Sequence, residues 1–371
     1  MNIVLINSKP LDRGHHQVYV SALRDELTSL GHNVAVIAPG TGCGKGRALG
    51  RRGSTAHAIT SRRGLHRTVI STLRKRAVDL VWETYGDDLR FRMSSRYSRM
   101  FESTAFLVTV HSPKPLVQEH HRFVASQLQR IGNDRLRAAL GATPAIVHTR
   151  RDVGALQRAG IPACALPWPV SEARAQAGTA GRTLRLLFVG DARRQKGLDV
   201  LLDALRIAKW DGEFRWVGGG SVANDMLTSR LGGRINWSVE PYAPSNDDLA
   251  HEYRTANAVA VPYTARFAER GGASGVLLEA LSHGRVVVGT QHAIGTLDEM
   301  PAGALVSDSD DPNGLAASLR TLSRDWRERL DVAQASGPAY IQRHGHLYRD
   351  YVERALALVE GGYGCDDRGS P

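Results

Sequence analysis

The sequence predicts an α/β protein of two doubly wound domains, each built on a parallel sheet, and three observations support this fold class. The chain begins with a strand, a helix and a second strand, the pattern of a βαβ unit. The same alternation starts again after residue 182. The 371 residues exceed one ordinary core and suit two domains, both large enough to bury a sizeable apolar interior.

In the first half, apolar strands alternate with helix-length segments. A strand at residues 2–7 precedes a helical pattern from Val18 to Leu30, which Gly31 ends. A second strand, Val34 to Ala38, completes the βαβ unit and implies a right-handed crossover. Further strands are expected at residues 80–82, 106–110 and 145–148.

A segment without apolar periodicity separates the two halves. Residues 171–182 are rich in alanine, glycine, serine and threonine and follow two prolines, so they predict a linker. Beyond it, we expect strands at residues 184–189, 213–217, 258–261 and 286–289, and helices at 197–209 and 276–282. The predicted organisation is a first domain at 1–170, a linker at 171–182, a second domain at 183–342, a C-terminal helix at 343–360 and a flexible tail at 361–371.

Composition argues against several classes of protein. No stretch approaches the roughly 18 apolar residues of a membrane span, and the first residues run into a strand instead of a signal peptide, so we expect a cytoplasmic protein. The three cysteines lie far apart without CxxC spacing, which indicates neither a disulfide framework nor a zinc site.

The positive charge favours anionic partners. Formal net charge is +11, and basic residues concentrate between Lys45 and Arg99. Such a surface attracts phosphates or an anionic membrane, and the apolar positions within residues 65–80 suit peripheral membrane contact. A solvated basic face and an ordinary packed helix are the alternatives. No aromatic or zinc motif of a nucleic-acid module is present, so no nucleic-acid partner is expected.

A loop early in the second half predicts an anion site. An apolar strand ends at Gly190, and the following loop carries Arg193, Arg194 and Lys196 before a helix begins near Gly197. Cationic side chains and the amides at a helix N-terminus together bind anions. A solvated basic loop is the alternative interpretation.

A second loop is rich in small residues and opens another helix. Gly272, Ser274 and Gly275 let the backbone approach a ligand closely, and the first amides of the helix, up to Val276, face the same place. We expect a diphosphate there. Glu279 in this helix can accept hydrogen bonds from ribose hydroxyls, and a surface glutamate is the alternative.

Together the two loops resemble the nucleotide-binding domain of GT-B glycosyltransferases, specifically the retaining glycosyltransferase family four (glycosyl transferases group 1). FVGDARRQKGLDVLLDAL is similar to the family's strand, loop and helix, in which a lysine at the place of Lys196 binds the donor diphosphate. SGVLLEALSHGRVVVGT is similar to its donor-binding helix, in which a glutamate at the place of Glu279 binds the ribose. LAHEYRTANAVAVPY and the N-terminal 40 residues extend the resemblance over most of the chain.

The resemblance implies a GT-B fold, in which two Rossmann-like domains face each other across a cleft and the C-terminal helix packs back on the first domain. It implies a hexosyltransferase-type enzyme that moves a sugar from a UDP- or GDP-sugar, used as co-substrate, to a hydroxyl of a small-molecule or lipid-linked acceptor. A natural product or an aminocyclitol fits the small-molecule case. No bound cofactor is expected.

The resemblance also implies roles for residues of the first domain. The loop of Gly14 and His15 follows the first strand and is expected to close over donor and acceptor, with exposed turn histidines as the alternative. His111 follows the strand at 106–110 and is expected to orient the donor sugar. The catalytic candidates are therefore Lys196, His111 and Glu279.

Two positions depart from the family's pattern. Asp191 stands where the family has an arginine, so Arg193 or Arg194 is expected to supply the charge. Counting back eight positions from Glu279 reaches Gly271, where the family has a second glutamate, and Glu269 is a nearby carboxylate. These departures keep open a GT-B-like binding or regulatory protein without transfer activity, and the shared architecture keeps open a nucleotide-sugar epimerase.

No metal site is expected. The aspartates at 87–88, 247–248 and 308–311 are interpreted as turn or cap residues. Cations and helix amides then stabilise the leaving diphosphate in place of a metal ion.

Overall fold

A computed structural model gives the structure of the protein. It describes residues 1–7, 15–39, 56–59, 70–72, 74, 77–85, 104–114, 133–134, 136–138, 140–141, 143–171, 183–218, 220, 223–240, 246–308 and 310–361. The chain divides into two compact units. Unit 1 comprises Met1–Pro167 and Tyr348–Pro371, and unit 2 comprises Trp168–Leu347.

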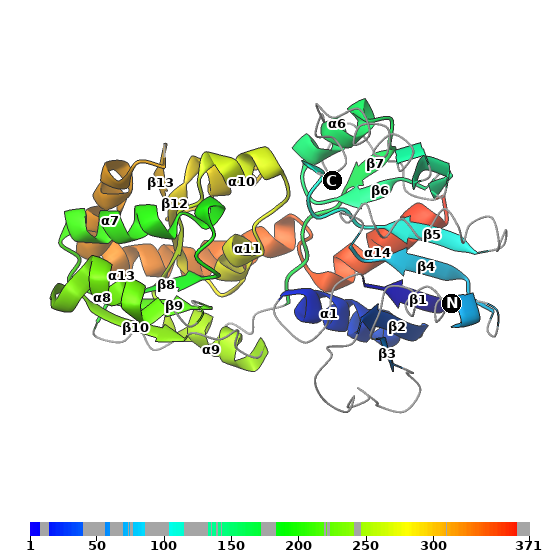
Figure 1. Cartoon of the computed structure of the whole chain (residues 1–371), viewed down its shortest axis with the longest axis horizontal. Helices are drawn as coiled ribbons and strands as arrows, with labels where there is room; N and C mark the ends of the chain where they lie inside the picture. The colour runs from blue at the N-terminus through cyan, green and yellow to red at the C-terminus, as the bar shows by residue number, and fades with distance from the viewer. Residues whose placement is uncertain are drawn as a thin grey trace. The chain divides into compact units, whose positions relative to one another are not determined.

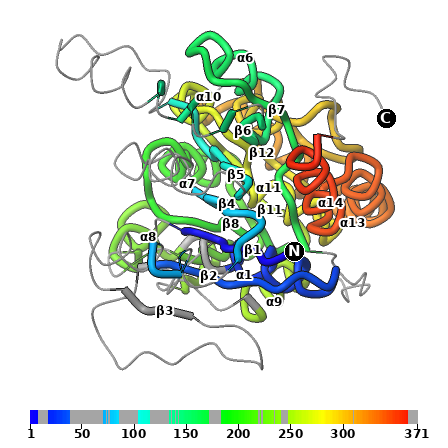
Figure 2. Tube along the Cα trace, turned by 90° about the vertical axis from the view of Figure 1, so that its right-hand side faces the viewer, coloured from blue at the N-terminus to red at the C-terminus, as the bar shows by residue number. Residues whose placement is uncertain are grey.

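Unit 1 is built on a parallel sheet with the strand order β3-β2-β1-β4-β5. Figure 2 shows β2, β1, β4 and β5 from one side. Its strands are β1 (Asn2–Ile6), β2 (Asn33–Pro39), β3 (Ala56–Ile59), β4 (Leu80–Glu83) and β5 (Ala105–Val108). A parallel pair, β6 (Ala145–Val147) and β7 (Ala163–Ala165), adjoins β5 through a bridge between Thr109 and Ile146. The order reverses between β1 and β4, and ligands of such sheets bind beyond the carboxyl ends of strands at this point.

The helices of unit 1 include α1 (His15–Ser29), α6 (Arg150–Arg158) and α14 (Tyr348–Val359). Leu23 and Leu27 of α1 share one buried core with Val352 of α14, because residues four apart lie on one face of a helix. The Tyr351 hydroxyl lies 2.8 Å from that of Tyr19 and 3.2 Å from Thr109 Oγ1. Polar contacts inside the apolar core therefore attach the C-terminal helix to α1 and to the sheet edge.

Unit 2 is built on a second parallel sheet with the strand order β10-β9-β8-β11-β12-β13. Its strands are β8 (Arg185–Val189), β9 (Glu213–Val217), β10 (Asn236–Glu240), β11 (Ala258–Val261), β12 (Val286–Thr290) and β13 (Leu305–Ser307). From β8 the chain proceeds outward to β9 and β10, whereas from β11 it proceeds the other way to β12 and β13. The switch point of this sheet therefore lies between β8 and β11.

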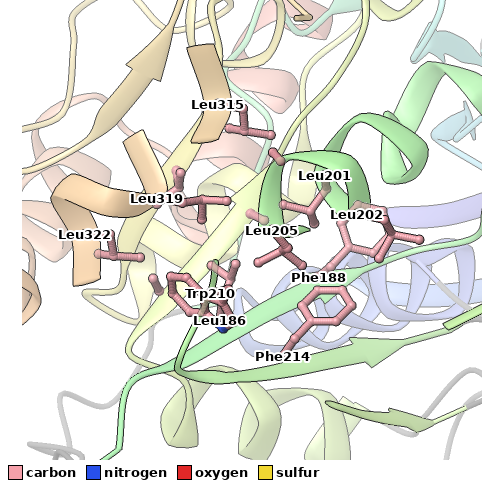
Figure 3. Packing of buried hydrophobic residues seen from close by; sticks show 14 of the residues in the cluster. Leu186, Phe188, Leu201, Leu202, Leu205, Trp210, Phe214, Leu315, Leu319 and Leu322 are labelled. Atoms are coloured by element: carbon pink, nitrogen blue, oxygen red, sulfur yellow. The ribbon is translucent and has the colours of Figure 1, made fainter. Parts of the chain in front are cut away.

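Helices cover the sheet of unit 2 (Figure 1). They are η2 (Arg194–Lys196), α7 (Leu198–Ala208), α8 (Ala223–Leu231), η3 (Gly232–Arg234), α9 (Asn246–Thr255), α10 (Ala265–Arg270), α11 (Gly275–Ser282), α12 (Gln291–Ile294) and α13 (Pro312–Arg343). Figure 3 shows Leu201 and Leu205 of α7 packed with Leu319 of α13 above the strand residue Leu186, all fully buried. This core holds the N-terminal end of α7, and with it the loop after β8, in a fixed place.

Several expectations about elements are correct and others are wrong. The strands expected at 213–217 and 258–261 have the bounds of β9 and β11. The helix expected to start at Arg343 is wrong, because Arg343 ends α13, and α14 begins only at Tyr348 after a turn at Gly345 with φ +64°. A loop at His15 is also wrong, because α1 begins there.

Some expectations fall on parts of the chain outside the described residues. These are Gly14, nearly all of the linker at 171–182 and of the tail at 361–371, and most of the basic segment between Lys45 and Arg99 with its possible membrane helix. Among the helices that the structure describes, none combines the length and the apolarity needed to cross a bilayer.

Candidate functional site

The switch point of unit 2 brings the two predicted loops together. Strands β8 and β11 pair in parallel, with Ala260 opposite Phe188, so both strands end at the same edge of the sheet. The loop after β8 contains Gly190 and Lys196, and the loop after β11 leads through α10 to Ser274. Segments about 70 residues apart in sequence thus form one site, as the fold rule for such sheets requires.

Tyr263 joins the two loops. Its hydroxyl accepts a hydrogen bond from the Lys196 ammonium at 2.6 Å and one from the Ser274 hydroxyl at 3.0 Å. The same ammonium lies 4.2 Å from the centre of the Tyr263 ring, a cation–π contact. Tyr263 is fully buried, and its backbone carbonyl accepts from Thr290. Because the ring is held so firmly, it fixes where the lysine charge lies.

Gly197 makes this arrangement possible. It has φ +65° and separates η2 from α7, and a Cβ atom at this position would lie 1.8 Å from the carbonyl oxygen of Pro262. The loop that carries Lys196 therefore packs directly on the residue that precedes Tyr263. Only glycine permits both the torsion and this approach.

The charges at the start of the same loop form an ion pair. Arg193 Nε lies 2.7 Å from Asp191 Oδ1, and both side chains are about half exposed. Asp191, which stands where the family has an arginine, therefore has its negative charge compensated by Arg193. The same ion pair reduces the positive charge that Arg193 can offer to a phosphate. Arg194 is exposed, and its carbonyl accepts from Thr264 at 3.3 Å.

Helix α11 presents its N-terminus beside the Tyr263 contacts. Ser274 caps the helix by accepting from the amide of Leu277 at 3.2 Å while it also contacts Tyr263. The amides of Gly275 and Val276 have no acceptor among the described residues, which is usual for a first turn. A Cβ at Gly275 would lie 3.3 Å from the Trp168 indole nitrogen, so a larger residue would be crowded there.

Glu279 lies in the interior of α11 and is partly buried. Burial raises the pKa of its carboxyl group to about 7. Within the described residues, no hydrogen bond or ion pair compensates this carboxylate. Its charge contributes to raising the pKa of the Tyr253 phenol, after the larger effect of burial. A partly buried carboxylate without a donor has unused capacity to accept hydrogen bonds from a ligand.

The loop between α10 and α11 contains two consecutive glycines with positive φ angles. Gly271 has φ +76° and ψ 178°, and Gly272 has φ +93°. The Gly271 conformation is essentially restricted to glycine, so a glutamate there would be strained. Glu269, the nearby carboxylate, is exposed near the end of α10.

In unit 1, His111 lies beyond the end of β5 and is buried. Its Nε2 lies 2.8 Å from the Thr84 carbonyl oxygen, and its Nδ1 lies 2.9 Å from Nε2 of His148. The ring of Tyr85 packs on the imidazole at a centroid distance of 4.1 Å. The structure thus places this histidine at the carboxyl ends of the strands of unit 1, with both ring nitrogens engaged.

Tyr263 and His148 were not identified from the sequence. Tyr263 lies in the segment AVAVPY that carries part of the resemblance, and its position directly after a buried strand is the signal that was available. His148 follows β6 in the same way. In a doubly wound sheet, polar residues at the carboxyl ends of strands lie where ligands bind.

No cluster of metal-ligating side chains occurs among the residues that the structure describes. Asp311 accepts from the amide of Gly314 and caps α13, and Asp310 accepts from the amide of Ala265. These two aspartates are therefore used in cap and loop contacts.

Two doubly wound units, one of which carries a cationic loop and a helix N-terminus at its switch point, have the fold of GT-B glycosyltransferases. Solved structures share this fold. The UDP-glucose complex of Anabaena HepE matches with a TM-score of 0.72 at 12% identity over 97% of this chain and 100% of that one. Sucrose-phosphate synthase from Thermosynechococcus elongatus matches with a TM-score of 0.71 at 17% identity over 97% and 99%.

Sequence comparison finds similarity to glycosyltransferases as well. Residues 183–325 match the model of the family described as Glycosyl transferases group 1, and the chain carries a domain of that family. D-inositol 3-phosphate glycosyltransferase 1 of Catenulispora acidiphila is 33% identical over 265 residues, which is 66% of this chain. The match spans 59% of the length of that relative.

Proposed function

We propose that this protein is a retaining glycosyltransferase that moves a sugar from a nucleotide-sugar donor to a hydroxyl of its acceptor. The observation that carries the proposal is the contact of Lys196 and Ser274 with Tyr263 at the switch point of unit 2. This contact brings the Lys196 ammonium group close to the N-terminus of α11. A positive charge beside free helix amides favours binding of the diphosphate of a donor.

The diphosphate binds to cations and amides in this proposal. An ammonium group has three donors, and Tyr263 takes one of those of Lys196, which leaves two for phosphate oxygens. The first-turn amides of Gly275 and Val276 point from the same helix end. When the bond between the anomeric carbon and the diphosphate oxygen breaks, negative charge grows on the diphosphate, and these donors stabilise it without a metal ion.

Glu279 binds the nucleoside in this proposal. Ribose hydroxyls donate to its carboxylate, and a ligand that donates such bonds favours the ionised form. Because burial raises the pKa of Glu279 to about 7, donor affinity rises with pH across this range.

The nature of the donor rests on structural neighbours. HepE of Anabaena was crystallised with UDP-glucose, and the trehalose-phosphate synthase of Burkholderia xenovorans carries the description UDP-forming. We therefore propose a UDP-sugar first and a GDP-sugar second. A small molecule, such as a natural product or an aminocyclitol, and a lipid-linked sugar are the proposed acceptors, and the proposed location is the cytoplasm.

The test is thermal-shift and calorimetric binding with UDP- and GDP-sugars, followed by NMR detection of the slow hydrolysis or transfer product. Lys196→Ala should lower turnover about a hundredfold, because one donor to the developing charge is lost. The matched control is Arg206→Ala, which removes an exposed cation of α7 in the same unit. Equal activity of the two variants would contradict the role of Lys196.

The same panel separates the rival functions. A binding or regulatory protein would bind nucleotide without turnover, and an epimerase would convert the donor sugar without releasing the diphosphate. The ion pair of Asp191 with Arg193 favours an active enzyme, because the carboxylate is already compensated beside the phosphate loop.

A further inference from the structure

Two buried histidines of unit 1 form a continuous chain of hydrogen bonds between two backbone carbonyls. The chain runs from the Thr84 carbonyl oxygen to His111 Nε2 (2.8 Å) and from His111 Nδ1 to His148 Nε2 (2.9 Å). It ends with His148 Nδ1 at 3.2 Å from the Leu166 carbonyl oxygen. The two rings lie nearly parallel, with centroids 4.8 Å apart and an interplanar angle of 30°.

Counting protons along this chain determines its charge. A carbonyl oxygen only accepts, so His111 Nε2 and His148 Nδ1 must each carry a hydrogen. If both rings were neutral, the two remaining nitrogens would face each other at 2.9 Å with lone pairs only, which is repulsive. A third hydrogen between them turns this contact into a hydrogen bond. Two imidazoles that hold three protons carry one positive charge.

We infer that His148 is a positioning residue for His111, and that the two imidazoles share one proton, so that the pair carries a single positive charge. The charge lies where β5 and β6 end, because His111 and His148 follow these neighbouring strands. In a doubly wound sheet, this edge is where ligands bind.

Aromatic rings surround the pair and suit a cation. Tyr85 packs on His111 at 4.1 Å with an interplanar angle of 34°, Tyr19 meets the same ring edge to face at 5.0 Å, and Tyr351 lies 6.0 Å from His148. The faces of such rings stabilise a cation. Burial raises the pKa of both Tyr19 and Tyr351 above that of an ordinary phenol, so these neighbours stay neutral when the pair titrates.

Other ionisable groups of unit 1 lie near the pair in sequence. They are Glu83, which precedes Thr84 in β4, Lys114 in the segment after His111, and Arg150, Arg151 and Asp152 at the start of α6. Of these groups, Glu83 and Asp152 are buried.

The contacts of His148 determine what His111 offers to a ligand. Both nitrogens of His111 are engaged, so the ring is held from two sides. Within the proposed function, on which this step rests, His111 acts through its fixed orientation and the shared charge. Without the shared proton, two N–H hydrogens remain for three contacts, so one of the three hydrogen bonds must break. Loss of the proton therefore changes what holds His111 as well as the charge of the pair.

The test is a pH titration of the full-length protein labelled with ¹⁵N-histidine, followed by NMR of the ring nitrogens. The variants are His111→Gln and His148→Gln, and the control is His346→Gln, which removes a buried histidine of unit 2 bonded to the Trp168 carbonyl. In the wild type at neutral pH we expect one proton shared between the two rings, lost in a single step that shifts both together. In His148→Gln, the amide donates to His111 Nδ1, so His111 becomes neutral and the coupled step disappears.

Two neutral rings that titrate independently in the wild type would overturn the inference. This measurement uses the wild-type protein alone, so it does not depend on whether a variant folds. Turnover provides a separate readout once a donor is known. His148→Gln should lower kcat about tenfold with an unchanged donor KM and a flattened pH profile. If both rings titrate together but the protein binds no nucleotide sugar, the proposed function is wrong and the shared proton of the histidine pair still stands. If kcat and its pH profile are unchanged in His148→Gln, the positioning role of His148 is wrong.

Discussion

Replacing Gly197 by alanine tests whether the contact between the two loops builds the site. The new Cβ would lie 1.8 Å from the Pro262 carbonyl oxygen and 2.9 Å from its carbon. Both atoms belong to the backbone, so the clash cannot be relieved by a rotamer change. Either the loop of Lys196 or the residue before Tyr263 must move.

Two costs add up in Gly197→Ala. The positive φ of +65° costs about 1–2 kcal/mol for a residue with a side chain. Forcing an extra carbon into a packed place costs about 1–3 kcal/mol more. For a unit of this size, 1 kcal/mol lowers Tm by roughly 2–4 °C, so we expect a loss of about 10 °C.

Gly232→Ala is the matched control, because it has the energetic cost of a positive φ without the cost of a steric clash. Gly232 has φ +61°, yet no atom lies within 4 Å of the position of its Cβ. This variant should lose only the torsional part, about 4 °C in Tm. Calorimetry should also show a tenfold or larger loss of UDP affinity in Gly197→Ala, because Lys196 moves away from Tyr263, and little change in Gly232→Ala. Equal Tm losses, or unchanged nucleotide affinity in Gly197→Ala, would refute this reasoning.

Three further predictions concern the same unit. Tyr263→Phe keeps the ring under Lys196 but removes the acceptor, so nucleotide affinity should fall about fivefold, the worth of one hydrogen bond, and an unchanged Kd would exclude a role in aiming the lysine. The pKa of Glu279 is raised in the folded state to about 7, so its contribution to stability is present at acidic pH and is lost as pH rises through 7; chemical denaturation at pH 5 and pH 8 should show a loss of about 2 kcal/mol in the wild type that is absent in Glu279→Gln. Transfer should proceed at the same rate with excess chelator, and recovery by magnesium or manganese after a chelator-induced loss would show that the cationic mechanism is wrong.

Elements with strong local signals were predictable, and those with weak signals were not. Strand β11 is an unbroken buried run of alanine and valine, and its predicted bounds are correct. Helix α13 contains Gly337 and Pro338, which usually mark a helix end. In the structure, Gly337 packs so closely on the Leu281 carbonyl that a Cβ would lie 2.4 Å away, which explains a glycine inside the helix.

The sequence by itself determined the alternation of strands and helices, the family resemblance and the roles expected of Lys196 and Glu279, because these depend on residues close together in the chain. The tertiary structure decided which side chains meet. Tyr263 lies 67 positions from Lys196, and His148 lies 37 positions from His111. These contacts depend on the order of strands in each sheet and on the direction in which each strand end points. Spacing along the chain encodes neither, so only the folded protein reveals the hydroxyl that positions the lysine and the second imidazole beside His111.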